Sequence, residues 1–240
     1  MVSFFRRRSS NVELPRVRAR SRVGNQSVNR VSLGELTPEA RSFLGRAAYV
    51  QLSIFTAVAH AVATAPHTRG KNALSRVAQL SLHKYEGLVA ELIRLGHDPV
   101  SAMEPFESST DRYQQIVLGK DWYECLVTSY VTAGLLDDFF VRLSGGLSDE
   151  ENSRIFDLLS PDTASQFIVT ELRSAIDANP RLASRLALWG RRLVGDTLLM
   201  ARSALVVPED TAPDETRLEP VFTDLIAAHT RRMDALGLTA

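Results

Sequence analysis

The sequence has little cysteine and no long uninterrupted apolar segment. Its single cysteine, Cys125, cannot form a disulfide within the chain, which favours a reducing, cytoplasmic compartment. No apolar run approaches the roughly 18 residues that a membrane-spanning helix needs, so we expect no membrane span. The first residues are basic and lead into no hydrophobic signal core.

Motifs for several common chemistries are also missing. The sequence contains no glycine-rich phosphate loop, no nucleophile elbow and no zinc-ligand spacing. None of its five histidines follows an Asp or Glu by three residues, so the Glu-x-x-His pattern of helical di-iron sites is absent. We therefore expect neither a bound metal nor another cofactor.

A formal net charge of zero hides a separation of charge along the chain. Residues 1–34 contain eight arginines, no lysine and one acid, Glu13, for a net charge of +7. The rest of the chain contains 20 basic and 27 acidic side chains, for a net charge of −7. This composition predicts a flexible arginine-rich arm over residues 1–34 and a mildly acidic folded domain over residues 35–240.

Apolar residues recur at helical spacing through most of the predicted domain, and no segment alternates convincingly with period two. Thr37-Pro38-Glu39 has the N-cap, first-position and first-turn residues of a helix start, and Gly96 is a typical helix stop. Ser148 and Glu151 have the spacing of a capping box. The predicted helices cover residues 37–63, 72–95, 110–118, 122–143, 149 to an interruption at 160–162, from there to 178, 180–206 and 220–236.

These helices predict an all-α fold. Long helices joined by short loops and one long crossover are typical of a ferritin-like helical bundle, here with additional C-terminal helices.

Several stretches of the domain resemble the MiaE-like family of bacterial tRNA hydroxylases, which belongs to the ferritin-like superfamily. The resemblance covers about residues 38–240, and its most specific parts are Leu188–Asp196 and Arg232–Thr239. Weaker matches lie at Ala48–Phe55, Asp121–Val127 and Tyr130–Leu135. The resemblance implies a bundle with a di-iron site that hydroxylates an isopentenyl-type modification on a tRNA adenosine, using dioxygen.

The iron ligands that the resemblance implies are replaced in this sequence. Such a site takes a Glu from the first helix, a Glu-x-x-His from the second, a carboxylate from the third and a second Glu-x-x-His from the fourth. Negatively charged oxygens and imidazoles of this kind are what two iron ions require. The corresponding positions here are Gln51, Ser81, Lys84, Ala133, Pro161 and Ala164.

Three of the replacements are polar and lie on otherwise apolar helical stripes: Gln51, Ser81 and Lys84. A polar group on a core stripe needs a partner, and a buried lysine needs a carboxylate to keep its proton. One hypothesis is that the Lys84 ammonium occupies the place of iron and pairs with a remaining acid. The candidate acids are Glu124, Asp137 and Asp138. The alternative is that Lys84 lies at the edge of the stripe and extends to water.

The arginine-rich arm suggests a binding function. Arginine makes bidentate contacts with phosphate and stacks on bases, so we expect this segment to bind RNA, such as tRNA or the ribosome. An acidic protein or membrane surface, or no partner at all, are the alternatives for the arm. The candidate RNA-binding residues are Arg6, Arg7, Arg8, Arg16, Arg18, Arg20, Arg22 and Arg30.

Three functions are consistent with these patterns. The first is a non-catalytic binding protein that contacts RNA or pairs with another copy or another ferritin-like subunit. The second is an active di-iron tRNA hydroxylase with an unusual site. The third is a bundle whose emptied site encloses a small apolar ligand near Gln51, Ser81 and Ala164.

Overall fold

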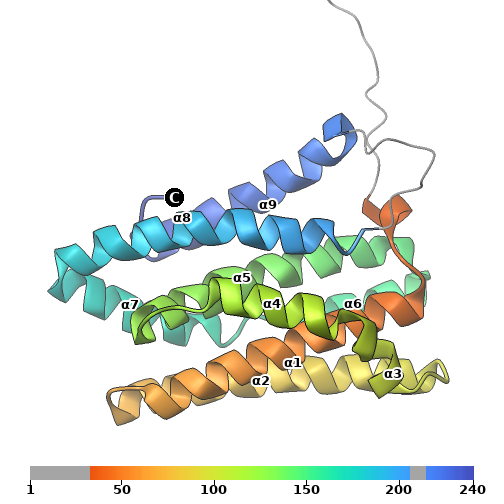
Figure 1. Cartoon of the computed structure of the whole chain (residues 1–240), viewed down its shortest axis with the longest axis horizontal. Coiled ribbons are helices and arrows are strands. Elements are labelled where there is room, and N and C mark those ends of the chain that lie inside the picture. The colour runs from red at the N-terminus through yellow and green to blue at the C-terminus, as the bar shows by residue number, and fades with distance from the viewer. Residues whose placement is uncertain (1–32, 206–214) are drawn as a thin grey trace, which may run out of the picture.

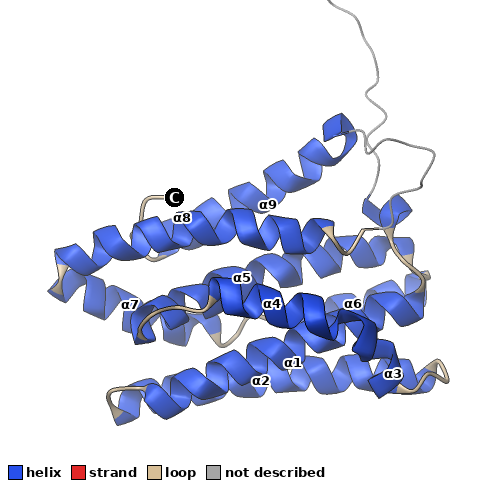
Figure 2. Ribbon diagram, in the orientation of Figure 1, coloured by secondary structure: helices blue, strands red, loops and turns tan. Residues whose placement is uncertain are grey.

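The computed structural model describes residues 33–205 and 215–240, and these two ranges contain helices and loops but no strand (Figure 2). The predicted all-α fold is therefore confirmed. The α-helices are α1 (Ala40–Thr64), α2 (Thr68–Arg94), α3 (Pro99–Met103), α4 (Glu107–Val117), α5 (Trp122–Leu143), α6 (Asp149–Leu159), α7 (Ser165–Ala178), α8 (Pro180–Arg202) and α9 (Glu215–Ala235). Short 3-10 helices lie at η1 (Leu33–Leu36), η2 (Glu104–Phe106) and η3 (Ser144–Gly146).

A four-helix arrangement forms the centre of the molecule. Helices α1 and α2 form an antiparallel pair joined by a short loop (Figure 1). Helices α3 and α4 then carry the chain back along the bundle, so that α5 begins at the same end as α2 (Figure 1). This crossover makes α2 and α5 parallel, which is the connectivity of a ferritin-like bundle with one long connection.

The fourth position of the bundle is shared by α6 and α7. Both helices contact α2 and α5, and they follow one another along the bundle, separated by residues 160–164 (Figure 1). The interruption contains Pro161, which has no backbone N–H and cannot continue the hydrogen bonding of α6. The carbonyl groups in the last turn of α6 are therefore free to accept hydrogen bonds from elsewhere.

Two further helices cover α5 from the other side. Helix α8 packs on α5, α4 and α7, and α9 packs on α5 and α8. A side chain at Gly190 would meet the Met233 side chain at 2.3 Å, so this glycine allows α9 to approach α8 closely. These are the additional C-terminal helices that the sequence predicts.

The sequence places some helix boundaries correctly and others a few residues away. Helix α5 has the predicted bounds, the capping box of Ser148 and Glu151 is present, and Gly96 ends α2 with a positive φ of 79°. Helix α1 begins at Ala40, because the Thr37 hydroxyl donates to the carbonyl of Leu143 instead of capping the helix.

Other differences concern the starts of two helices and of the domain. Helix α2 begins four residues before the predicted start, since the His67 side chain accepts a hydrogen bond from the backbone N–H of Gly70 and caps it. Helix α9 begins at Glu215, five residues early. Leu33 is buried, so the last two residues of the predicted arm, 33 and 34, belong to the folded body. The rest of the predicted arm lies outside the described residues.

Helix α1 is the one helix in the described ranges that is long and apolar enough to cross a membrane. It has 25 residues and a mean hydropathy of 1.4 over its most apolar window. The helix contains no unbroken apolar run of that length, because alanine and valine on several sides raise its mean hydropathy while charged and polar residues interrupt it. Core helices of globular bundles meet the same criterion, and ten residues of α1 are buried here.

A buried histidine on α9 makes its packing sensitive to pH. His229 is 3% exposed, and neither of its ring nitrogens has a hydrogen-bond partner among the described residues. Burial, together with the positive charge of Arg232, lowers the pKa of His229 below its ordinary value of 6.5. The neutral ring is therefore favoured in the folded protein, and the charged ring is favoured when the protein unfolds.

We expect the free energy of unfolding to fall as pH drops below about 6.5, by up to about 1.4 kcal/mol per pH unit. The sign follows from the lowered pKa, since the unfolded chain takes up a proton that the folded chain resists. Urea unfolding between pH 7.5 and 5 measures this slope. His229→Leu should flatten it, whereas His60→Gln at an exposed position should leave it unchanged. An unchanged slope in His229→Leu would contradict the assignment.

Candidate functional site

A polar network lies at the centre of the otherwise apolar bundle. The Lys84 ammonium donates to Asp137 Oδ2 at 2.6 Å and to the carbonyl oxygen of Leu159 at 3.0 Å. The Gln51 side-chain amide donates to Asp137 Oδ1 at 2.6 Å. The network therefore joins α1, α2, α5 and the end of α6, so each of the four positions of the bundle contributes one group.

The burial of Lys84 decides between the two alternatives that the sequence leaves open. Lys84 is 3% exposed and Gln51 is 2% exposed, so neither side chain extends to water. The Asp137 side chain is 16% exposed. Lys84 thus forms a buried ion pair, and its charge is balanced inside the bundle.

The charge state of Asp137 is set by two opposing effects. Burial raises the pKa of Asp137 above its ordinary value, and the charge of Lys84 and the hydrogen bonds from Lys84 and Gln51 offset only part of this rise. Both carboxylate oxygens already accept a short hydrogen bond from a protein donor. Removing the lysine would therefore leave a buried carboxylate without its main stabilising partner.

A small cavity of about 30 Å³ adjoins the network. Five of the six positions aligned with iron ligands line it: Gln51, Ser81, Lys84, Ala133 and Ala164. The cavity is large enough for one or two water molecules but far too small for an organic ligand. An enclosed apolar ligand at this position, the third function considered from the sequence, is thus contradicted.

The sixth aligned position, Pro161, does not line the cavity and is exposed. Its neighbour Asp162 lies at the cavity instead, and its negative charge adds to the rise in the pKa of Asp137. Pro161 contributes indirectly, because it ends α6 and so leaves the carbonyl of Leu159 free for Lys84.

Two of the three acids proposed as partners of Lys84 have other partners. Glu124 is buried and accepts hydrogen bonds from Arg185 and from the backbone N–H of Lys120. Asp138 pairs with Arg232 of α9 at 2.9 Å. Asp137 and Asp138 are neighbours in sequence, but successive residues of a helix point about 100° apart, so only Asp137 reaches the interior.

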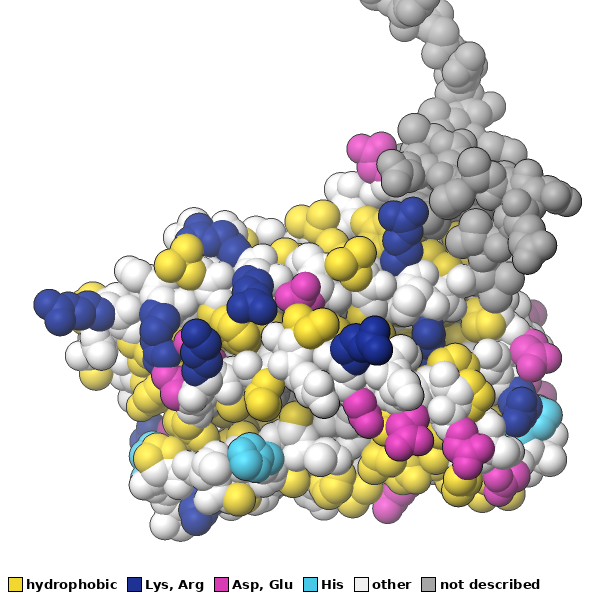
Figure 3. Space-filling model, viewed as in Figure 1, with side chains coloured by type: hydrophobic (Ala, Val, Ile, Leu, Met, Phe, Trp, Pro, Cys, Tyr) yellow, Lys and Arg dark blue, Asp and Glu magenta, His cyan; other side chains and the backbone are white. Residues whose placement is uncertain are grey.

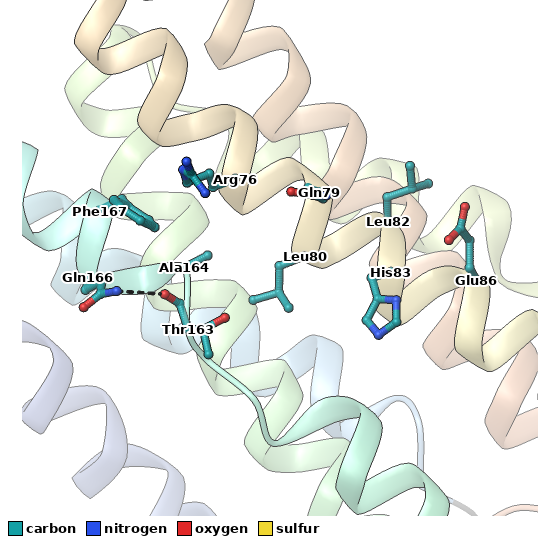
Figure 4. A pocket seen from close by; sticks show the side chains of 10 residues that line it. All are labelled: Arg76, Gln79, Leu80, Leu82, His83, Glu86, Thr163, Ala164, Gln166 and Phe167. Atoms are coloured by element: carbon teal, nitrogen blue, oxygen red, sulfur yellow. Dashed lines mark hydrogen bonds between the residues drawn. The ribbon is translucent and has the colours of Figure 1, made fainter.

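An open groove of about 620 Å³ lies on the surface outside this cavity, between α2 and the start of α7 (Figure 4). Leu80 and Ala164 line both the groove and the inner cavity, so these two side chains separate them. His83 and Glu86 also line the groove, as does Gln166, whose amide donates to the carbonyl of Thr163 (Figure 4).

The side chains of this site do not fit a di-iron centre. Such a centre needs several carboxylates and imidazoles, but the cavity is lined by no glutamate and no histidine. Both oxygens of Asp137 are occupied, and the Lys84 ammonium repels a second cation at the same place. Within residues 33–205 and 215–240, no cluster of three or more His, Cys, Asp or Glu side chains has a metal-binding arrangement.

Replacement of Lys84 by methionine should destabilise the protein by about 3–5 kcal/mol, because it leaves the Asp137 carboxylate buried and without its cation. The double variant Lys84→Met with Asp137→Asn should recover more than half of this loss, since Asn keeps an acceptor for Gln51 and has no charge. Urea unfolding of both variants measures the two changes.

Lys71→Met, an exposed lysine on the same helix, is the matched control and should change stability by less than about 0.5 kcal/mol. Equal stabilities of Lys84→Met and Lys71→Met would show that the Lys84 ion pair does not support the fold.

Comparison with known proteins agrees with the fold and assigns no reaction or ligand. A family model described as a ferritin-like domain of actinomycetes matches residues 39–213, which spans α1 to α8 and leaves out α9. No curated protein matches the chain. Because the match covers most of the sequence, the chain belongs to this family of ferritin-like domains.

Proposed function

We propose that this chain is a non-catalytic ferritin-like binding protein in which an internal ion pair replaces a metal centre. The observation that carries the proposal is the position of Lys84, whose ammonium is buried between α2, α5 and α6 and bound to Asp137 at 2.6 Å. A fixed protein cation at this position stabilises the bundle as a metal does in a carboxylate bundle, because it holds the buried acid and the surrounding helices together.

In this proposal, the chain descends from a di-iron hydroxylase of the MiaE-like type, which its sequence resembles. An ancestral di-iron site would have lost its ligands at Gln51, Ser81, Lys84, Ala133, Pro161 and Ala164, and the Lys84–Asp137–Gln51 network would have taken its place. Hydroxylase chemistry needs redox-active iron, and the donor set at this position does not fit it. Binding rather than catalysis is therefore the function that the site supports best.

RNA is the partner that we propose for the N-terminal segment. Eight of the chain's 28 basic residues lie in residues 1–34, and all eight are arginines. The rest of the chain has a net charge of −7, so the positive charge available for phosphate contacts is most concentrated in this segment. A second copy of the chain or another ferritin-like subunit are further partners that we propose for the bundle.

We expect the full chain to bind single-stranded RNA with an affinity that falls steeply with salt, with a logarithmic slope of up to about −5.6 if all eight arginines contact phosphates. A variant with these eight arginines replaced by glutamine should lose most of the affinity and most of the slope. Fluorescence anisotropy of labelled RNA at 50 and 200 mM salt measures both quantities.

The charge-preserving control replaces the same eight arginines with lysine. It should keep the salt slope, because the slope counts charges, and lose only the part of the affinity that depends on guanidinium geometry and stacking. Equal RNA affinity of the wild type and the glutamine variant would rule out the segment as the RNA-binding element.

A further inference from the structure

The exposed side of α8 has a composition unlike that of the rest of the surface. Helix α8 contains five arginines and a single acid, Asp196. Its buried side packs leucines and Trp189 against the core, and its solvent side carries arginine together with large apolar side chains. Lys and Arg side chains gather over this helix in Figure 3, whereas acidic side chains lie over α3 and the start of α4.

Arginines and leucines share one line of this surface. Arg181, Arg185, Leu188, Arg192 and Leu199 follow each other at spacings of four, three, four and seven residues, which places them on one stripe about 27 Å long. Leu188 is 65% exposed and Leu199 is 67% exposed, the two largest values among the exposed large hydrophobic side chains of the described residues.

The arginines of this face are only partly neutralised. Arg185 pairs with Asp121 and Glu124, and Arg192 lies 3.9 Å from Asp196. Arg181 on the stripe and Arg191, which neighbours Leu188 at the edge of the stripe, are exposed, and neither has an ion pair within the described part of the chain. The surface therefore has unbalanced positive charge next to exposed apolar groups, and an anionic occupant is the complementary one.

The type of apolar side chain distinguishes between two anionic partners, single-stranded nucleic acid and an anionic lipid bilayer. Binding to single-stranded nucleic acid relies on exposed aromatic rings that stack on bases. The one aromatic residue of α8, Trp189, is 9% exposed, and Arg192 covers its ring with 5.3 Å between the guanidinium carbon and the ring centroid. Leucine does not stack on bases, but it inserts into the boundary between lipid headgroups and acyl chains beside arginines that bind anionic headgroups.

We propose that the face of α8 formed by Arg181, Arg191, Leu188 and Leu199 binds the surface of anionic lipid bilayers. The leucines enter the headgroup–acyl boundary, and the guanidinium groups remain at the level of the lipid phosphates. This association is peripheral and reversible, because a single face with two inserted leucines provides little buried apolar area. It does not depend on the RNA contacts proposed for residues 1–34.

Vesicle partitioning of the full chain tests this inference. We expect binding to phosphatidylcholine vesicles that contain 30% phosphatidylglycerol, at low salt, and little binding to phosphatidylcholine alone. Each arginine near an anionic surface raises partitioning about fivefold, so Arg181→Gln with Arg191→Gln should lower it about 25-fold. Leu188→Ser with Leu199→Ser should lower it about tenfold or more.

Matched controls lie on other surfaces. Ile93→Ser with Val100→Ser removes two apolar side chains that are each 60% exposed, and Arg112→Gln with Lys71→Gln removes two exposed charges. These variants should partition like the wild type. Circular dichroism identifies any variant that fails to fold, and the glutamine variant of residues 1–34 measures the contribution of that segment.

A local probe gives a second readout that does not depend on total binding. An environment-sensitive dye at Ser184→Cys, in a Cys125→Ser background, should become brighter on anionic vesicles, because position 184 is exposed one turn before Leu188. The same dye at Ser75→Cys on α2 should not. Equal partitioning of the face variants and their controls would overturn the proposal, as would an unchanged dye signal at position 184. Loss of RNA affinity without loss of vesicle binding in the face variants would assign the face to RNA instead.

Discussion

The ion pair between Lys84 and Asp137 is the interaction on which the interior of this bundle depends. It brings together α2 and α5, Gln51 adds α1, and the carbonyl of Leu159 adds α6. Two charges in a protein interior are expensive to desolvate, and they are tolerated only when their hydrogen bonds are satisfied. Asp137 has both oxygens satisfied and Lys84 has two acceptors, so the pair fixes how the four positions of the bundle meet.

The division of the fourth bundle position into α6 and α7 follows from the need of Lys84 for hydrogen-bond acceptors. A continuous helix would use the Leu159 carbonyl in its own hydrogen bonding, and Lys84 would then lack its second acceptor. The interruption at residues 160–164 releases this carbonyl and places Ala164 at the cavity. Pro161, which the resemblance to MiaE-like hydroxylases places at an iron-ligand position, therefore acts on the backbone and not as a side chain in the site.

Much of the fold can be predicted from the sequence because its signals are local. The glycine at Gly96 and the capping box at Ser148 each determine a boundary within a few residues. The buried network can be predicted in part, since Gln51 and Lys84 interrupt apolar stripes and need partners. The choice of Asp137 over Asp138 and the bond between Gln51 and Asp137 depend on how helices rotate against each other, which spacing along one helix does not determine. The cap of α1 was misplaced for the same reason, because Thr37 bonds to a carbonyl 106 residues away.

The proposed replacement of a metal centre by a protein cation is tested most directly by the iron content of the folded protein. The full chain is incubated with Fe(II) without oxygen, desalted, and measured by inductively coupled plasma mass spectrometry against its protein concentration. If Lys84 and Asp137 fill the site, the protein retains far less than one iron per chain, and Lys84→Met does not raise the value to two. Two irons per chain in the wild type would contradict the account and would restore di-iron hydroxylation as the leading function.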